Sequence, residues 1–138
     1  MGWKEKMKEF GGGNFTFLST DGETIIFIVV GEPVLLHSFY KGKEQERIGC
    51  PIVTDEGYQL FICGKRPARK ISKYESLFDK YALRVVRNGV EGDSNATYFV
   101  GLVAEPETFE RLKAIKDADF EPTMIQDSVD EATQVLGE

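Results

Sequence analysis

Basic and aromatic side chains alternate through the middle of the chain. Between residues 65 and 87, eight lysines and arginines accompany only two carboxylates. Positive side chains can follow a phosphate backbone, and exposed rings between them offer surfaces on which bases stack. A solvated surface carries similar charges, so an ordinary polar surface remains the alternative to a polyanion site. The candidate binding residues are Phe39, Tyr40, Lys41, Lys43, Arg47, Tyr58, Lys65, Arg66, Arg69, Lys70, Lys73, Tyr74, Tyr81 and Arg84.

The aromatic residues need a second criterion, because a ring in a strand packs in the core more often than it stacks on a base. A tyrosine beside Lys or Arg is the better candidate for a binding surface, since its hydroxyl group tolerates water. Four phenylalanines are assigned to the core instead, three in predicted strands and one on the apolar face of the predicted helix. These residues are Phe27, Phe61, Phe99 and Phe109.

Motifs that would indicate catalysis are missing from the sequence. His37 is the single histidine, and Ser38–Lys41 lacks the partner motifs of a Ser-x-x-Lys enzyme. No glycine-rich phosphate loop is present. Cys50 and Cys63 could join His37 around a metal, but no Cys-x-x-Cys pair anchors such a site, and two buried thiols are expected instead. We therefore expect a binding protein that is not an enzyme and holds no cofactor or metal.

Charge divides the chain into a basic body and an acidic end. Residues 91–138 carry three Lys and Arg side chains and twelve carboxylates, in a protein whose net charge is −6. A basic region beside an acidic tail suits a polyanion binder with a separate docking segment. No apolar run reaches the length of a membrane span, and no signal peptide is recognisable. We expect a cytoplasmic protein, in the host cell if it is viral, without membrane contact.

Five runs of β-branched and aromatic residues predict strands, because turn residues separate them. Residues 41–49 between two of these runs are predicted as a polar connection. Residues 64–70 are predicted as a basic loop stiffened by Pro67. The predicted strands are Thr24–Val30, Val34–Tyr40, Tyr58–Cys63, Lys80–Arg87 and Ala96–Val103.

Helical periodicity is confined to the two ends of the chain. Trp3–Phe10 predicts a short N-terminal helix, and an apolar residue at every third position of residues 109–115 predicts a helix after the last strand. These elements favour a mainly β domain over residues 1–116, a five-stranded Greek-key barrel of the OB-fold kind, with a β-sandwich as the alternative. Residues 117–138 are expected to form an acidic, weakly ordered tail, part of which can be a short helix.

Several short motifs follow one another in a characteristic order. They are Asp21–Thr24 before an apolar strand, Gly31–Pro33, Phe39–Tyr40, Cys50–Pro51, Cys63–Pro67, Tyr81–Arg87 and Glu107–Leu112. Over about residues 10–116, this order resembles a group of bacteriophage OB-fold single-stranded DNA-binding proteins. The chain departs from that group at Ile52 and Val53, where a cysteine knuckle would need a second cysteine, and in a tail without an aromatic tip.

The resemblance implies a protein that coats single-stranded DNA during phage replication or recombination. Other replication or recombination proteins would then dock on the acidic tail, and the protein could act as a homodimer. Two other hypotheses remain open from the residues. One is a protein–protein adaptor that acts through its acidic tail. The other is a binder of RNA or of a small molecule on the same fold.

Overall fold

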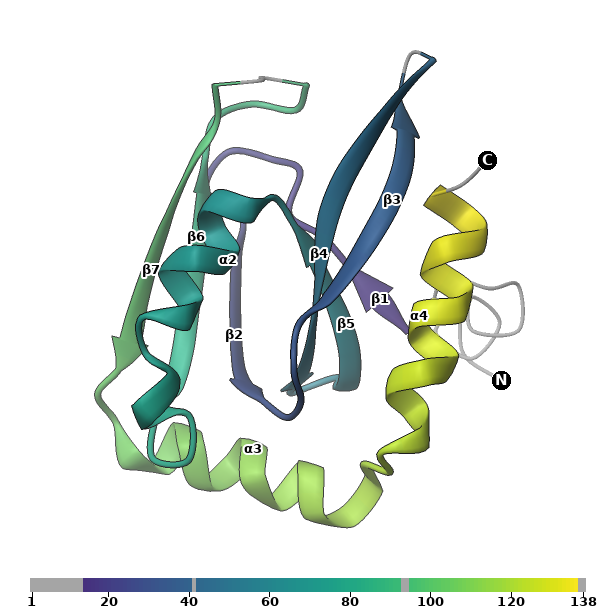
Figure 1. The fold of residues 1–138 in the computed structure, drawn as a ribbon. Coiled ribbons are helices and arrows are strands. Elements are labelled where there is room, and N and C mark those ends of the chain that lie inside the picture. Colours follow the sequence, from purple (N-terminus) through teal and green to yellow (C-terminus); the bar gives the residue numbers. More distant parts are fainter. Residues whose placement is uncertain (1–13, 41, 93–94, 137–138) are drawn as a thin grey trace, which may run out of the picture.

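The computed structural model describes residues 14–40, 42–92 and 95–136 of the 138-residue chain, with the backbone alone at Tyr40. Within these residues the protein is mainly β, with seven strands in one open mixed sheet and three α-helices (Figure 1). No helix in this part of the chain is long and apolar enough to cross a bilayer. The strands are β1 (Phe15–Thr16), β2 (Thr24–Val29), β3 (Val34–Tyr40), β4 (Lys43–Thr54), β5 (Gly57–Cys63), β6 (Ala82–Asn88) and β7 (Thr97–Val103). The helices are α2 (Lys65–Ser72), the short 3-10 helix η1 (Glu75–Leu77), α3 (Pro106–Asp119) and α4 (Thr123–Leu136).

The long strand β4 organises the sheet. Its first half forms an antiparallel hairpin with β3, and its second half pairs with β5 on one side and with β2 on the other. β2 also pairs with β6, which forms a hairpin with β7, while β1 adds in parallel to β5. The order is therefore β1-β5-β4-β2-β6-β7, with β3 attached to β4. The β3–β4 and β6–β7 hairpins form two arms at one end of the molecule (Figure 1).

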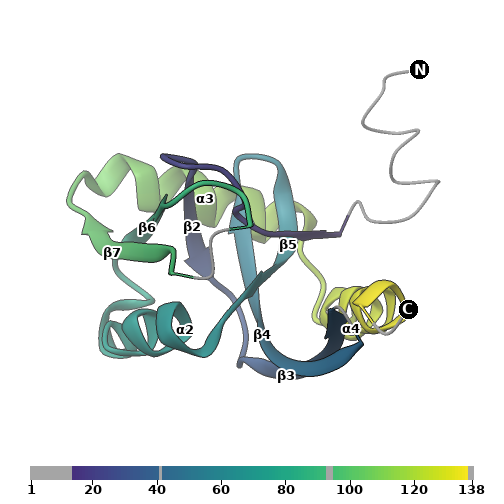
Figure 2. The same ribbon diagram turned by 90° about the horizontal axis from the view of Figure 1, so that it is seen from above.

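Apolar side chains gather in three clusters that the sheet and the helices divide between them. The first lies between the strands and α2 and contains the rings of Phe27 and Phe61, whose centroids are 5.9 Å apart. α3 covers the second cluster with the fully buried Leu112, and α4 covers the third by placing Ala132 against Leu60. Figure 2 shows the three helices on different sides of the sheet. Burying one such large apolar side chain stabilises the fold by about 1.5–3 kcal/mol.

The five predicted strands coincide with β2, β3, β5, β6 and β7 within two residues at each end. The sequence did not indicate β1 or the long β4, which includes most of the predicted polar connection. Residues 43–47 pair with β3 although most of their side chains are exposed, because a hairpin is held by backbone hydrogen bonds. The helix expected at Trp3–Phe10 lies outside the described residues.

The basic segment expected to be a loop is instead the helix α2. Pro67 lies in its first turn, where a helix tolerates proline because the missing N–H would have no partner there. Pro67 and Ile71 are both buried and lie four residues apart, so the helix has one apolar face on the core. Its four Lys and Arg side chains are exposed on the other side.

The acidic end of the chain differs from the weakly ordered tail that we expected. α3 continues to Asp119, and α4 packs against β3 and β5 through an apolar stripe that includes Val129, Ala132 and Leu136. The contact between α4 and the loop after β2 is close, since a Cβ added at Gly31 would lie 2.7 Å from Cδ1 of Ile125. Many carboxylates lie between these apolar residues, so the helical spacing of the apolar residues was not apparent in the sequence.

Candidate nucleic-acid interface

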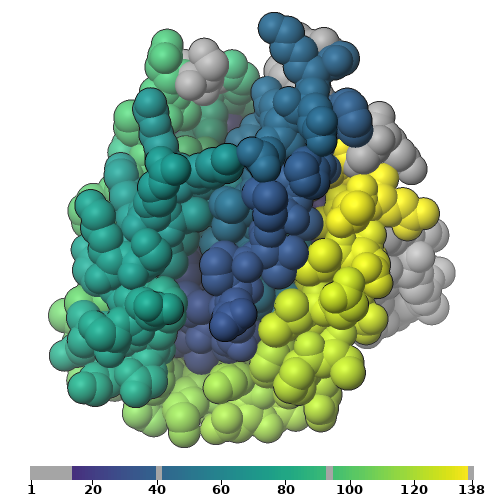
Figure 3. All heavy atoms as spheres, viewed as in Figure 1, coloured from purple at the N-terminus to yellow at the C-terminus, as the bar shows by residue number. Residues whose placement is uncertain are grey.

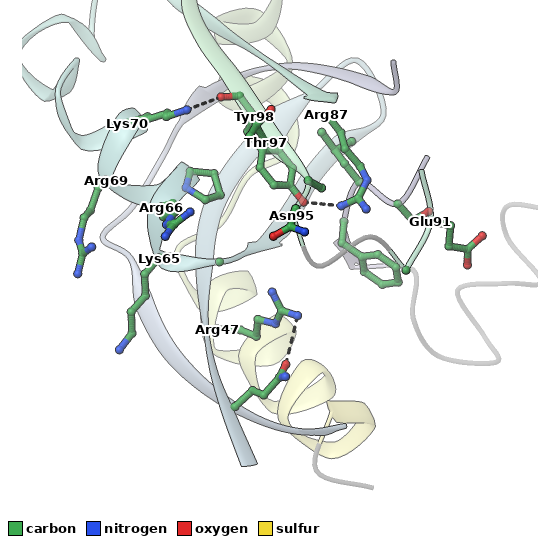
Figure 4. A pocket seen from close by; sticks show the side chains of 18 of the residues that line it. Arg47, Lys65, Arg66, Arg69, Lys70, Arg87, Glu91, Asn95, Thr97 and Tyr98 are labelled. Carbon is green, nitrogen blue, oxygen red and sulfur yellow. Dashed lines mark hydrogen bonds between the residues drawn. The ribbon is translucent and has the colours of Figure 1, made fainter. Parts of the chain in front are cut away.

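A cleft of about 1250 Å³ opens between the two arms of the molecule. Its walls come from β4 in the first arm, the loop between β6 and β7 in the second, the first turns of α2, and residues 17–19 after β1 (Figure 4). In the space-filling view, the two hairpin arms stand apart at the top of the molecule, above α2 (Figure 3). Neither α3 nor α4 contributes a residue to the cleft.

The cleft is positively charged although the whole chain is acidic. Among the described residues, six cationic side chains line it together with two carboxylates, those of Glu46 and Glu91, in a protein of net charge −6. Five of the cations are exposed, so they can move toward a ligand without leaving a buried partner behind. Clustered cations in a concave site attract anions and raise their local concentration. The six cations are Arg47, Lys65, Arg66, Arg69, Lys70 and Arg87.

Helix α2 presents most of these charges because of how its residues are spaced. Lys65 and Arg69 are four residues apart, as are Arg66 and Lys70, so each pair lies on one side of the helix. The first turn of α2 contains no acidic residue and receives no side-chain cap, although Gly64 leads into it in an extended conformation. The positive end of the helix dipole therefore adds to the cationic side chains at the cleft.

The cations differ in how far neighbouring groups already engage them. Nζ of Lys65 lies 2.8 Å from Oε1 of Glu46 across the cleft, and this hydrogen bond lowers the pKa of Glu46. Nζ of Lys70 donates to the backbone oxygen of Tyr98 at 2.6 Å. Among the described residues, no ion pair engages Arg66 or Arg69. These two arginines are therefore the best placed to contact phosphate groups.

Arg87 differs from the other five because its side chain is only 8% exposed. Its Nε donates to the backbone oxygen of Gly89 at 3.0 Å, and one terminal nitrogen donates to the backbone oxygen of Val90 at 2.8 Å. The other terminal nitrogen donates to the hydroxyl group of Tyr98 at 2.8 Å. The guanidinium also lies 5.8 Å from the centroid of the Tyr98 ring. These bonds hold the start of the β6–β7 loop beside the cleft.

Aromatic rings lie on the same surface as the cations. Phe17, which is 54% exposed, and Tyr98 line the cleft itself. A smaller hollow of about 280 Å³ continues from the cleft, because Lys70 and Tyr98 line both, and it adds Lys73, Tyr74 and the ring of Phe99. Exposed rings beside cations can stack on unpaired bases.

Of the four phenylalanines predicted in the core, three are buried and one is exposed. Phe27, Phe61 and Phe109 are buried, which confirms the prediction for these three. The prediction is wrong for Phe99, which is 50% exposed. Side chains alternate between the two faces along a strand, and in β7 the neighbours of Phe99 belong to the core cluster, so its own ring points away from that cluster.

Seven of the candidate binding residues lie at the cleft or at the adjoining hollow. They are Arg47, Lys65, Arg66, Arg69, Lys70, Lys73 and Tyr74. Phe39 and Lys43 are exposed near the tip of the β3–β4 hairpin, outside the cleft lining. Lys41 and the side chain of Tyr40 lie outside the described residues.

Tyr58 lies away from the cleft and holds α4 in place. Its ring packs on Phe120 with a centroid distance of 5.4 Å, and its hydroxyl oxygen lies 2.7 Å from Oγ of Ser128. Because the Ser128 hydroxyl donates to the backbone oxygen of Ile125, the Tyr58 hydroxyl is the donor in their bond. Burial at this contact raises the pKa of Tyr58.

Two further candidates also lie apart from the cleft. Arg84 is exposed on the face of β6 opposite to Leu83, Val85 and Arg87, which face the core and the cleft. Tyr81 is half-buried just before β6, and its backbone N–H donates to the backbone oxygen of Leu77. Neither side chain lines the cleft or the hollow.

Three basic or aromatic residues of the cleft lining are not among the candidates predicted from the sequence: Phe17, Arg87 and Tyr98. Alternation along the predicted strand could have separated Arg87 from Arg84, because residues three apart in a strand face opposite ways. No comparable signal marks Phe17, which comes from a segment too short to predict as a strand.

The structure does not bring the histidine and the cysteines together. His37 is exposed, and its Nδ1 lies 2.9 Å from Oε1 of Glu44. Cys50 and Cys63 are free thiols buried in the first core cluster. Their mutual hydrogen bond, together with burial, raises the pKa of Cys63. In the part of the chain that the structure describes, no group of three metal-ligating side chains is found.

Known proteins give no direct guide to function. No family model, curated protein or solved structure matches the chain. What the protein binds must therefore be inferred from the charge, shape and lining residues of the cleft.

Proposed function

We propose that the protein binds single-stranded DNA in the cleft between its two arms, with little dependence on base sequence. The observation that carries this proposal is the lining of the cleft, whose described residues include six cations, two carboxylates and two aromatic residues. The cations supply contacts to phosphates, and the rings supply stacking of about 1–3 kcal/mol per base. The role in phage replication or recombination that the sequence resemblance implies belongs to the same proposal.

The order of the strands supports an OB-fold reading of this architecture. β5, β4, β2, β6 and β7 are hydrogen-bonded neighbours in that order, and α2 connects β5 to β6. An OB-fold is a partly open five-stranded Greek-key barrel that binds oligonucleotides between two of its loops. In this reading, β1 and β3 are additions, and the cleft lies between the two corresponding connections, one between β2 and β4 and one between β6 and β7.

The rings of the cleft, those of the exposed Phe17 and the half-buried Tyr98, favour a single strand over a duplex. Phe17 and Tyr98 can stack only on bases whose faces are free, and a duplex hides those faces within its own stack. Cations alone would bind either form, since both carry a phosphate on each nucleotide. The small hollow beside the cleft, which includes Phe99, extends the surface on which successive bases can lie.

The adaptor hypothesis has less support. It needs an acidic tail that is free to reach a partner, but Ser128 and Ala132 of α4 are fully buried against the rest of the fold. The side chain of Asn14 also donates to the carboxylate of Glu131, at 3.2 and 3.3 Å to its two oxygens. α4 is therefore part of the folded domain over its described length.

Fluorescence polarisation with labelled oligonucleotides tests the proposal. We expect a labelled dT oligonucleotide to bind at low salt and to bind more weakly as salt rises, because counterions compete for the phosphates. A duplex of equal length should bind more weakly than the single strand. Absence of dT binding at low salt as well as at high salt would refute the proposal. Stronger binding of an rU oligonucleotide than of dT would assign the cleft to RNA.

A further inference from the structure

The cleft contains one cation that is not on its rim. Five of the six cationic side chains are exposed, but that of Arg87 retains only 8% of its accessible surface. Arg87 reaches the cleft from the end of β6, beside Tyr98 of the neighbouring strand (Figure 4). Its position is therefore fixed by two paired strands, whereas the cations of α2 lie on flexible exposed side chains.

The hydrogen bonds of Arg87 leave part of the guanidinium available. Its three bonds within the protein go to two backbone oxygens and one tyrosine hydroxyl, all of them uncharged acceptors. A guanidinium carries five N–H donors, so two remain, one on each terminal nitrogen. Two donors on adjacent terminal nitrogens match the spacing of two oxygens on one phosphate group.

The positive charge of Arg87 also lacks a bonded counter-charge in the described part of the chain, where no ion pair includes it. Oε1 of Glu23 accepts hydrogen bonds from the backbone N–H groups of Ser19 at 2.8 Å and Thr20 at 3.2 Å. These bonds, and to a smaller extent the charge of Arg87, lower the pKa of Glu23. Glu91 lines the cleft as an exposed side chain. A buried charge that has only uncharged partners remains partly uncompensated, so an anion that enters the cleft gains more from Arg87 than from an exposed lysine.

We propose that Arg87 is the anchor of an anion subsite that holds one phosphate group at the wall of the cleft formed by β6 and β7. The proposed function supplies the identity of the ligand, a phosphodiester of the bound strand, and the subsite itself requires only a phosphate. The exposed cations of α2 then guide the strand to the cleft, and Arg87 fixes the position of one nucleotide within it. The competing interpretation is that Arg87 only braces the β6–β7 loop.

NMR of the arginine Nε–H groups in the ¹⁵N-labelled full chain separates the two interpretations. The Nε–H of Arg87 donates to Gly89, which protects it from rapid exchange and makes its signal observable. The signal can be assigned through its own backbone resonances, so no variant is required. At mildly acidic pH, where exposed arginine Nε–H groups also exchange slowly, Arg84 is the internal control, because it belongs to the same strand and faces the other way.

We titrate the protein with inorganic phosphate and, separately, with a dT oligonucleotide. Phosphate should shift the Arg87 signal saturably while the Arg84 signal stays in place, and sulfate should compete. An unmoved Arg87 signal at saturating phosphate would overturn the subsite and leave Arg87 as a brace. A saturable phosphate shift without any oligonucleotide binding would keep the subsite and refute the proposed function instead.

Arg87→Lys adds a functional measurement. It keeps the charge but removes the pair of donors, so we expect dT affinity to fall about tenfold or more, as for a lost charged hydrogen bond. Arg84→Lys makes the same exchange on the opposite face of β6, outside the cleft, and should leave dT affinity unchanged. Unchanged dT affinity in folded Arg87→Lys protein would also overturn the proposal.

Discussion

Arg84 and Arg87 belong to the same strand but have different environments. The first is exposed on the outer face of β6, and the second is buried beside the cleft, where it bonds to the β6–β7 loop. The same residue type is therefore an exposed surface charge at one position and a buried part of the cleft lining at another. Such pairs give matched controls for every experiment on charge.

Replacement of the two unpaired arginines of α2 tests their contact with phosphates. Arg66→Ala and Arg69→Ala should each weaken binding of all single-stranded sequences alike and lower the salt slope by about 0.7. Arg84→Ala removes an equal charge from the outer face of β6 and should leave affinity unchanged. Polarisation titrations at four salt concentrations measure both quantities. Equal losses in all three variants would mean that net charge, rather than the cleft, governs binding.

Tyr58 was a candidate binding residue, but its contacts assign it to stability. Tyr58→Phe removes the donor to Ser128 and should lower the free energy of unfolding by about 1 kcal/mol, as for one hydrogen bond. DNA affinity per folded molecule should not change. Urea denaturation and polarisation measure the two effects, and a Ser128→Ala variant completes a double-mutant cycle. A loss of affinity with unchanged stability would return Tyr58 to the binding surface.

At the scale of elements, apolar periodicity predicted five of the strands and α3 but missed the two-residue β1 and, among the longer elements, β4 and α2. Residues 43–47 of β4 contain no apolar side chain, so no alternation marks them, and their strand depends on pairing with β3. α2 is eight residues long, which is too short for a helical period to stand out, and only Pro67 and Ile71 show its buried face. Tertiary pairing and packing decided both elements.

The residues of the candidate site were predictable to a similar extent. The charge cluster of residues 65–70 was visible in the sequence because its members are neighbours along the chain. Phe17 and Tyr98 were not, because they meet only where the segment after β1 approaches the β6–β7 hairpin. A site assembled from distant segments leaves no local pattern to find.

The packing of α4 is open to a direct test at two adjacent positions. Ala132 is fully buried against β3 and β5, whereas Thr133 is exposed. Ala132→Asp places a charge in an apolar contact and should destabilise the protein by about 3 kcal/mol or more. Thr133→Asp adds the same charge at the surface and should change stability little. Thermal unfolding measures the melting temperatures of the two variants. Equal melting temperatures would show that α4 does not pack as described.

The molecule as a whole combines a net charge of −6 with one strongly positive cleft. The acidic residues that outnumber the basic ones are concentrated after residue 91, and many of them lie on α3 and α4. Because neither helix lines the cleft, the negative charge faces other directions. The field of such a molecule favours approach of a polyanion from the side of the cleft.

The total salt dependence measures how much of the cleft a strand occupies. If all six cations contact phosphates, the plot of log affinity against log salt should have a slope of about −4, given roughly −0.7 per contact to a single strand. A slope nearer −2 would mean that the strand uses only one wall of the cleft. A slope close to zero would contradict phosphate contacts altogether, whatever the affinity.

The hydrogen bond of Lys70 has a consequence for solubility. β7 ends the sheet, so the outward backbone oxygens of Tyr98 and Val100 form an edge that a strand of another molecule could extend. Lys70 donates to the first of these oxygens at 2.6 Å, and the Tyr74 hydroxyl donates to the second at 3.4 Å. α2 and the turn after it thus shield the edge from intermolecular pairing.

Lys70→Ala should therefore increase self-association as protein concentration rises, because it uncovers the edge of β7 and removes a charge from it. Lys73→Ala removes a neighbouring exposed charge that has no bond to the edge among the described contacts, and it should remain dispersed. Sedimentation velocity over a concentration series compares the two, and identical profiles would contradict the protective role of Lys70. A ligand that binds the ammonium group of Lys70 would likewise expose the edge of β7. Ligand binding in the cleft would then favour contact between neighbouring protein molecules.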